Sequence, residues 1–198
     1  MIHTLRVFLL TVFFAPLAFG ATTWKIDSDH SAANFKIRHM MVSNVRGNIA
    51  GLDGKIMMDG DKVSTMKVDV SLDAKTINTN DKKRDDHLRS KDFFAVEEYP
   101  KITFKSEKVT GTDSKFEIQG KLTLHGKTKS VTFKGTDLTK EVKGPWGNTR
   151  RGFSATTTID RKDFGITWNK AMDNGGVVVG NEVEVTVEVE IIKEDKKS

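Results

Sequence analysis

Residues 182–191 read EVEVTVEVEI, and this stretch decides the fold class. Its odd-numbered positions are all valine or isoleucine, from Val183 to Ile191, whereas its even-numbered positions are four glutamates and Thr186. Because successive side chains of a β-strand point to opposite faces, one face of this segment is apolar and the other is acidic. The pattern predicts a strand with one face on a core and the other toward water, as in antiparallel sheets.

The same two-residue period recurs upstream, near residues 33–41, 45–58, 67–72, 101–105, 116–124, 131–134 and 153–159. It places Phe104 and Phe116 inside and Lys105 and Glu117 outside. Turn sequences such as GPWG at residues 144–147 separate these segments. We therefore predict an all-β fold, an extended antiparallel barrel of about eight strands. Glycines interrupt the large apolar side chains on its inward faces. The interior is therefore either a packed core or a lumen that holds one ligand, and both alternatives stay open.

One segment, residues 80–90 (NDKKRDDHLRS), has the composition of a charged helix lying between two strands. Asn78 or Asn80 is a candidate cap, and acidic residues in the first turns favour the helix dipole. We expect this single helix to lie at the side of the barrel, tied to it by Arg84, His87 and Arg89.

The first twenty residues differ from the rest of the chain. Residues 7–19 are almost wholly apolar, and Ala18-Phe19-Gly20 matches the small-x-small pattern of a signal-peptidase site. The apolar run is shorter than the roughly 20 residues that a membrane span needs. We predict a cleaved signal peptide at residues 1–20, a mature domain at 21–198, a periplasmic location and no stable membrane anchor.

Composition and motifs exclude several classes of function. The chain has no cysteine, so it has no disulfide and no thiolate metal site, and its formal net charge of +5 is spread along the sequence. Such a distribution does not indicate a nucleic-acid partner. The GxSxG, HExxH and GxGxxG motifs are absent. We expect no catalytic residues, no metal and no cofactor.

Four blocks of sequence carry a resemblance to a known family. The first is His30-Ser31, Phe35, His39-Met40 and Val45-Arg46-Gly47; the second is residues 84–90 (RDDHLRS) with Asp92-Phe93-Phe94 and Tyr99-Pro100; the third is residues 122–128 (LTLHGKT); the fourth is residues 152–155 (GFSA) with 159–165 (IDRKDFG). In this order they resemble the YceI family of exported, lipocalin-like polyisoprenoid-binding proteins. The likeness extends from Trp24 to near Ile192.

The resemblance implies a lipocalin-like barrel with a helix beside it and a long apolar channel. It further implies a polyisoprenoid ligand, such as a quinone tail, or a similar long-chain amphiphilic lipid, bound for carriage, storage or sequestration and without catalysis. Two alternatives stay open: an enzyme that acts on an isoprenoid lipid with His87 or His39 as base, and a ligand-free structural or stress module with a filled barrel. A homodimer also stays open, although the outward glutamates of the last strand argue against close contact between two copies.

The inward positions of the predicted strands supply the candidate ligand-lining residues, together with the two phenylalanines that follow the helix. They are Phe35, Ile37, His39, Met41, Val70, Leu72, Phe93, Phe94, Ile102, Phe104, Phe116, Ile118, Leu122, Phe133, Phe153 and Val185. Phe93 and Phe94 would gate one end or pack the helix onto the barrel. For the polar head group we name His39, which has the inward parity of its strand, and Arg46.

Overall fold

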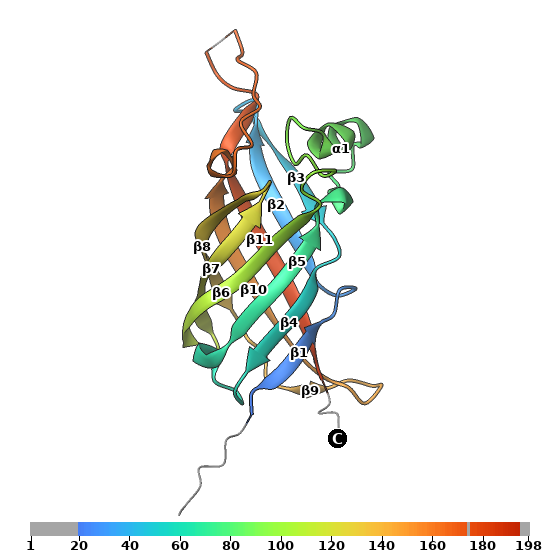
Figure 1. Cartoon of the computed structure of the whole chain (residues 1–198), viewed down its shortest axis with the longest axis vertical. Helices are drawn as coiled ribbons and strands as arrows, with labels where there is room; N and C mark the ends of the chain where they lie inside the picture. Colours follow the sequence, from blue (N-terminus) through green and yellow to red (C-terminus); the bar gives the residue numbers. More distant parts are fainter. Residues whose placement is uncertain (1–19, 174, 195–198) are drawn as a thin grey trace, which may run out of the picture.

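The computed structural model describes residues 20–173 and 175–194, which form an elongated β-barrel with one α-helix beside its upper end (Figure 1). The strands are β1 (Thr22–Ile26), β2 (Ala32–His39), β3 (Ser43–Ile49), β4 (Asp53–Met58), β5 (Lys67–Asp73), β6 (Lys101–Thr112), β7 (Lys115–Leu124), β8 (Lys127–Thr136), β9 (Val142–Lys143), β10 (Thr149–Asp160) and β11 (Val179–Lys193). The helix is α1 (Lys82–Arg89), and the 3₁₀ turns are η1 (Val63–Thr65), η2 (Ala74–Thr76) and η3 (Arg161–Phe164). The predicted signal peptide lies outside the described residues, apart from Gly20.

The barrel closes through β11, the strand that contains the alternating residues 182–191. One edge of β11 pairs with β10 from Asp160↔Glu182 to Arg150↔Ile192. Its other edge pairs with β2 in the upper half and with β1 in the lower half. The closed ring runs β11-β1-β4-β5-β6-β7-β8-β10, and β2 and β3 extend it upward. The predicted antiparallel all-β barrel with one helix is therefore confirmed.

The side-chain parity read from the alternation also holds. Phe104 and Phe116 are buried, whereas Lys105 and Glu117 are exposed. The segment at residues 45–58 is divided into β3 and β4 by a break at which Gly51 has a φ of +73°. Two short strands, the five-residue β1 and the two-residue β9, were not predicted from the alternation.

A salt-bridged joint connects the lower strand β1 to the upper strand β2. The Arg150 guanidinium donates hydrogen bonds to the carboxylates of Asp27 and Glu190. The backbone N–H of Glu190 donates to the Ser31 hydroxyl at 2.9 Å, and Asp27 N–H donates to the Glu190 carbonyl at 2.9 Å. These bonds satisfy the polar groups that the strand break would otherwise leave unpaired.

Helix α1 is fixed beside the upper rim by its own charged residues. Asp81, rather than Asn78 or Asn80, is the N-cap, and its carboxylate accepts a hydrogen bond from Arg84 N–H at 3.1 Å. The buried Asp85 carboxylate accepts bonds from the backbone N–H and the hydroxyl of Thr79. Arg89 donates to the Ile77 carbonyl at 2.7 Å, which joins the helix to the residue that follows η2. Within the described residues, no helix is long and apolar enough to cross a membrane.

Candidate functional site

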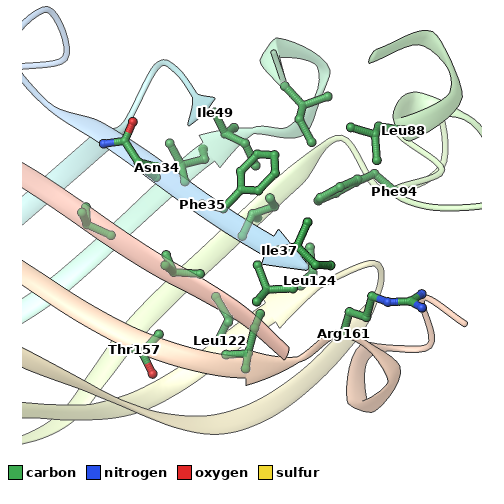
Figure 2. Close-up of a pocket in the computed structure, with 18 of the residues that line it drawn as sticks. Asn34, Phe35, Ile37, Ile49, Leu88, Phe94, Leu122, Leu124, Thr157 and Arg161 are labelled. Atoms are coloured by element: carbon green, nitrogen blue, oxygen red, sulfur yellow. The ribbon is translucent and has the colours of Figure 1, made fainter. Parts of the chain in front are cut away.

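A cavity of about 560 Å³ occupies the barrel from its middle to its upper end. This volume lies within the range of small-molecule sites, about 300–1,000 Å³. Figure 2 shows Phe35 and Ile37 of β2 facing Leu122 of β7 across this space, with Leu88 and Phe94 approaching from the side of α1.

The wall of the cavity is apolar because the strands direct their apolar side chains toward it. β11 alone contributes four alternate valines, at positions 183, 185, 187 and 189. Most of the predicted lining residues border this cavity, namely Phe35, Ile37, His39, Val70, Leu72, Phe93, Phe94, Ile102, Phe104, Ile118, Leu122, Phe133, Phe153 and Val185.

Three of the residues predicted at the site do not border the cavity. Met41 is 57% exposed outside the cavity, because β2 ends at His39 and Met41 lies in the following turn with a φ of +62°. Arg46 is exposed because it has the outward parity of β3, opposite Lys36 in the pairing of β2 and β3. Phe116 is buried but does not border the cavity, since its ring packs on Phe153 nearer the lower end.

Glycines let the large rings lie against the barrel wall. A Cβ on Gly47 would lie 2.5 Å from the ring of Phe35, and a Cβ on Gly120 would lie 2.7 Å from the ring of Phe104. Real side chains cannot approach so closely, so the ring occupies the space that a neighbouring side chain would take. Each of these glycines therefore leaves space against the wall for a phenylalanine ring, and both rings border the open lumen.

Polar side chains border the cavity mainly at its upper end, which we call the mouth. Most of these residues are basic: Arg38 and His39 from β2, Lys83, Arg84 and His87 from α1, and Arg161 from η3, together with Asp81. Arg84 is engaged by the Thr79 hydroxyl and carbonyl at 2.7 and 3.0 Å. Lys83 has no ion-pair partner within the described residues. The lumen thus combines an apolar body with a polar end.

Three aromatic rings bring α1 and the loop after η3 together at the mouth. The imidazole of His87 lies 5.0 Å from the ring centroids of both Phe93 and Trp168, edge-on in each case, and Phe93 and Trp168 lie 5.1 Å apart. The His87 Nε2 atom is 2.8 Å from the Asp92 carboxylate. This aromatic cluster of His87, Phe93 and Trp168 connects two elements that are far apart in sequence.

Arg161 holds the loop that carries Trp168. Its guanidinium donates to the carbonyls of Ile166, Trp168 and Gly180 at 2.7, 2.9 and 2.8 Å. Burial lowers the pKa of this guanidinium from its usual value, against the opposing effect of Asp160. Figure 2 shows the head group directed away from the lumen, so only the apolar stem contributes to the wall.

Sequence reasoning missed Trp168 and Arg161 as site residues. Both lie outside the alternating strand segments, where the two-residue period gives no information about direction. Arg161 occurs in the fourth family-like block, IDRKDFG, which was a usable signal. Trp168 had no comparable signal, because its place depends on the path of an irregular loop.

A second cluster, at the joint, has the ligand types of a metal site. One ligand atom from each of Asp27, His30 and Glu190 lies within 4.8 Å of the other two. The Arg150 guanidinium already contacts both carboxylates, so it supplies the positive charge that a cation would bring. The arrangement fits a structural ion-pair network.

Comparisons with known proteins agree with this architecture. A family model described as a YceI-like domain matches residues 24–191. A UPF0312 protein of Pseudomonas putida (strain W619) is 40% identical over 166 residues, covering 77% of this chain and 86% of that protein. A UPF0312 protein of Staphylococcus aureus (strain N315) is 35% identical over 170 residues, covering 85% and 96%.

Solved structures share the fold. The Campylobacter jejuni YceI protein superposes with a TM-score of 0.67 at 28% identity, over 80% of this chain and 90% of that one. Burkholderia cenocepacia BcnA gives a TM-score of 0.71 at 22% identity, covering 83% and 98%. A polyisoprenoid binding domain from Saccharophagus degradans gives 0.65 at 16% identity, covering 86% and 98%.

Proposed function

This chain belongs to the YceI-like family, and from that premise we propose that it binds one polyisoprenoid, or a similar long-chain amphiphilic lipid, in its barrel. The observation that carries the proposal is the apolar cavity of about 560 Å³ with polar groups gathered at its mouth. A neighbour in fold is described as a polyisoprenoid binding domain, which supports the same ligand class. The cavity also argues against the alternative of a filled barrel without a ligand.

Burial of the lipid tail would supply the binding free energy. Removing apolar surface from water stabilises a complex by about 25 cal/mol per Å², or roughly 0.8 kcal/mol for each buried CH₂ group. The valines of β11 offer an apolar surface to such a tail, and so do Phe35 and Phe104, whose rings lie against glycines. The head group would lie at the mouth near His39, which borders the cavity where β2 ends.

The physiological role that we propose is carriage, storage or sequestration of this lipid in the periplasm. It requires export, for which the apolar residues 7–19 and the Ala18-Phe19-Gly20 pattern are the sequence support. The exported protein should begin at Ala21 on N-terminal sequencing. A secreted protein that still begins at Met1 would remove the proposal of a cleaved signal.

An isoprenoid length series tests the binding proposal. Affinity for the purified protein should rise with chain length until the cavity is full. Ile118→Trp should lose mainly the longest ligands, because Ile118 borders the lumen. The control is Gln119→Trp, the next residue of β7, which is exposed on the outer face. Affinity independent of length, or equal losses in both variants, would contradict a ligand in the lumen.

An enzyme that acts on an isoprenoid lipid is the second candidate, and one observation favours it. The carboxylate of Asp92 contacts His87 at the mouth, an arrangement that can orient an imidazole as a general base. Native mass spectrometry of the protein from its own host should recover the lipid, and incubation should leave it unchanged if the protein is a carrier. Conversion of the lipid that is lost in His87→Gln would favour the enzyme.

A further inference from the structure

The turn between β2 and β3 exposes three consecutive large apolar side chains at the upper end of the barrel. Met40, Met41 and Val42 are 45%, 57% and 77% exposed, and Val177 in the neighbouring loop is 39% exposed. We call these four residues the apolar tip. Exposed apolar residues that gather at one place mark a surface for interaction more often than isolated ones do.

The backbone of the tip is held in place by hydrogen bonds. Met40 N–H donates to the Val178 carbonyl at 2.8 Å, which joins the turn to the loop that contains Val177. The Arg38 guanidinium donates to the Met41 carbonyl at 2.7 Å. Met40 and Met41 have φ values of +48° and +62°, a backbone conformation that residues other than glycine rarely adopt. The turn therefore keeps its apolar side chains outside although its backbone conformation is unfavourable.

Positive charge flanks the apolar tip on the two strands that lead into it, β2 and β3, whereas the loop that contains Val177 has one charge of each sign, Lys170 and Asp173. Residues 32–49 contain Lys36, Arg38 and Arg46 and no aspartate or glutamate. Lys36 pairs with Glu184, but neither Arg38 nor Arg46 has a carboxylate partner within the part of the chain that the structure describes. An apolar end with a cationic border complements the surface of a bilayer that contains anionic lipids.

The tip is also continuous with the mouth of the cavity. His39 and Val178 border the cavity and are the immediate chain neighbours of the tip residues Met40 and Val177. We propose that the apolar tip docks on a membrane that contains anionic lipids and thereby turns the mouth of the barrel toward the bilayer. This docking surface lies beyond the proposed lipid site, and none of the four tip residues borders the cavity.

Vesicle co-sedimentation of the purified protein tests the proposal, with phosphatidylcholine vesicles compared with vesicles of equal parts phosphatidylcholine and phosphatidylglycerol. The double variant M41D/V42D should bind the anionic vesicles at least about tenfold more weakly, because it replaces apolar contacts with like charge. Arg46→Gln should bind them about fivefold more weakly. The control is Trp146→Asp, since Trp146 is 81% exposed on the β9–β10 turn at the opposite end (Figure 1).

The expected result is preference of the wild type for anionic vesicles, loss in M41D/V42D and no change in Trp146→Asp. Affinity for an isoprenoid in detergent solution should stay the same in M41D/V42D, which separates docking from ligand binding. No sedimentation of the wild type with either vesicle would overturn the proposal. So would greater loss in Trp146→Asp than in M41D/V42D, or a dimer in solution that M41D/V42D converts to monomers, which would show that a second copy covers the tip.

Discussion

The two ends of the barrel are made of the same alternating strands, yet their interiors differ. At the lower end Trp24, Met58 and Ile191 are at most 1% exposed, and the Arg151 guanidinium lies 5.9 Å from the Trp24 ring centroid. At the upper end Phe35 and other inward residues stay half-buried around the cavity.

The difference arises from the segments that cover each end. At the lower end, Val63 of η1 and Leu138 after β8 are buried in the core cluster. At the upper end, the covering segments are α1 and the loop held by Arg161, which contribute the half-buried Leu88 and Trp168. The strands determine the wall of the barrel, and the covering segments determine whether its interior is filled.

The largest expected effect tests whether the lower end is the stable part. Trp24→Ala should lower the free energy of unfolding by about 3–5 kcal/mol, because it leaves a cavity among fully buried side chains. Phe94→Ala at the mouth should cost less than half as much, since Phe94 is only partly buried. Urea denaturation measures both, and equal losses would contradict the contrast between the ends.

Enlarging a side chain should affect the two ends differently. Val63→Trp should destabilise the protein by about 1–3 kcal/mol through overpacking, because Val63 is 4% exposed in the filled end. Val185→Trp should cost less, since Val185 borders the open lumen, and it should reduce binding of long lipids. Thermal unfolding and lipid titration of both variants check this. A larger loss of stability in Val185→Trp would mean that the upper lumen is packed.

The features that can be predicted from the sequence lie within the strands, whereas the ends of strands and the covering segments cannot be predicted in this way. Alternation places Phe104 inside and Lys105 outside because side-chain direction along a strand is a local property. It does not reveal the end of a strand, so Met41 was placed inside although β2 ends at His39. It also carries no information about Trp168, whose position depends on distant hydrogen bonds from Arg161.

A smaller effect is expected at the joint between the two halves. Burial would raise the pKa of the Asp27 carboxyl, but hydrogen bonds from His30 and Arg150 outweigh it and hold that pKa below its usual value. The ionised form therefore stabilises the fold at neutral pH, and this contribution is lost as the pH falls through the lowered pKa. Asp27→Asn should cost about 1 kcal/mol at neutral pH.

Denaturation at several pH values measures this contribution. The difference between wild type and Asp27→Asn should shrink as the pH falls through the lowered pKa of the Asp27 carboxyl. Asp29→Asn is the control, because the exposed Asp29 side chain makes no ion pair within the described residues. A difference between wild type and Asp27→Asn that persists unchanged in acid would assign the stability to the shape of the side chain and not to its charge.

The smallest effect on stability is expected at the aromatic cluster of the mouth. Trp168→Leu keeps an apolar side chain but removes the ring contacts with His87 and Phe93. Such a contact contributes about 0.5–1.5 kcal/mol beyond burial, and the half-buried position places the loss near the lower value.

If these contacts hold the loop over the mouth, their loss should change ligand exchange more than protein stability. Stopped-flow measurement should therefore show severalfold faster lipid release, with a nearly unchanged unfolding midpoint. The control is Trp146→Leu, an exposed tryptophan at the opposite end, which should leave the release rate unchanged. Unchanged release in Trp168→Leu would mean that lipid leaves by a path that does not pass the cluster, and the mouth would then lie elsewhere on the upper rim.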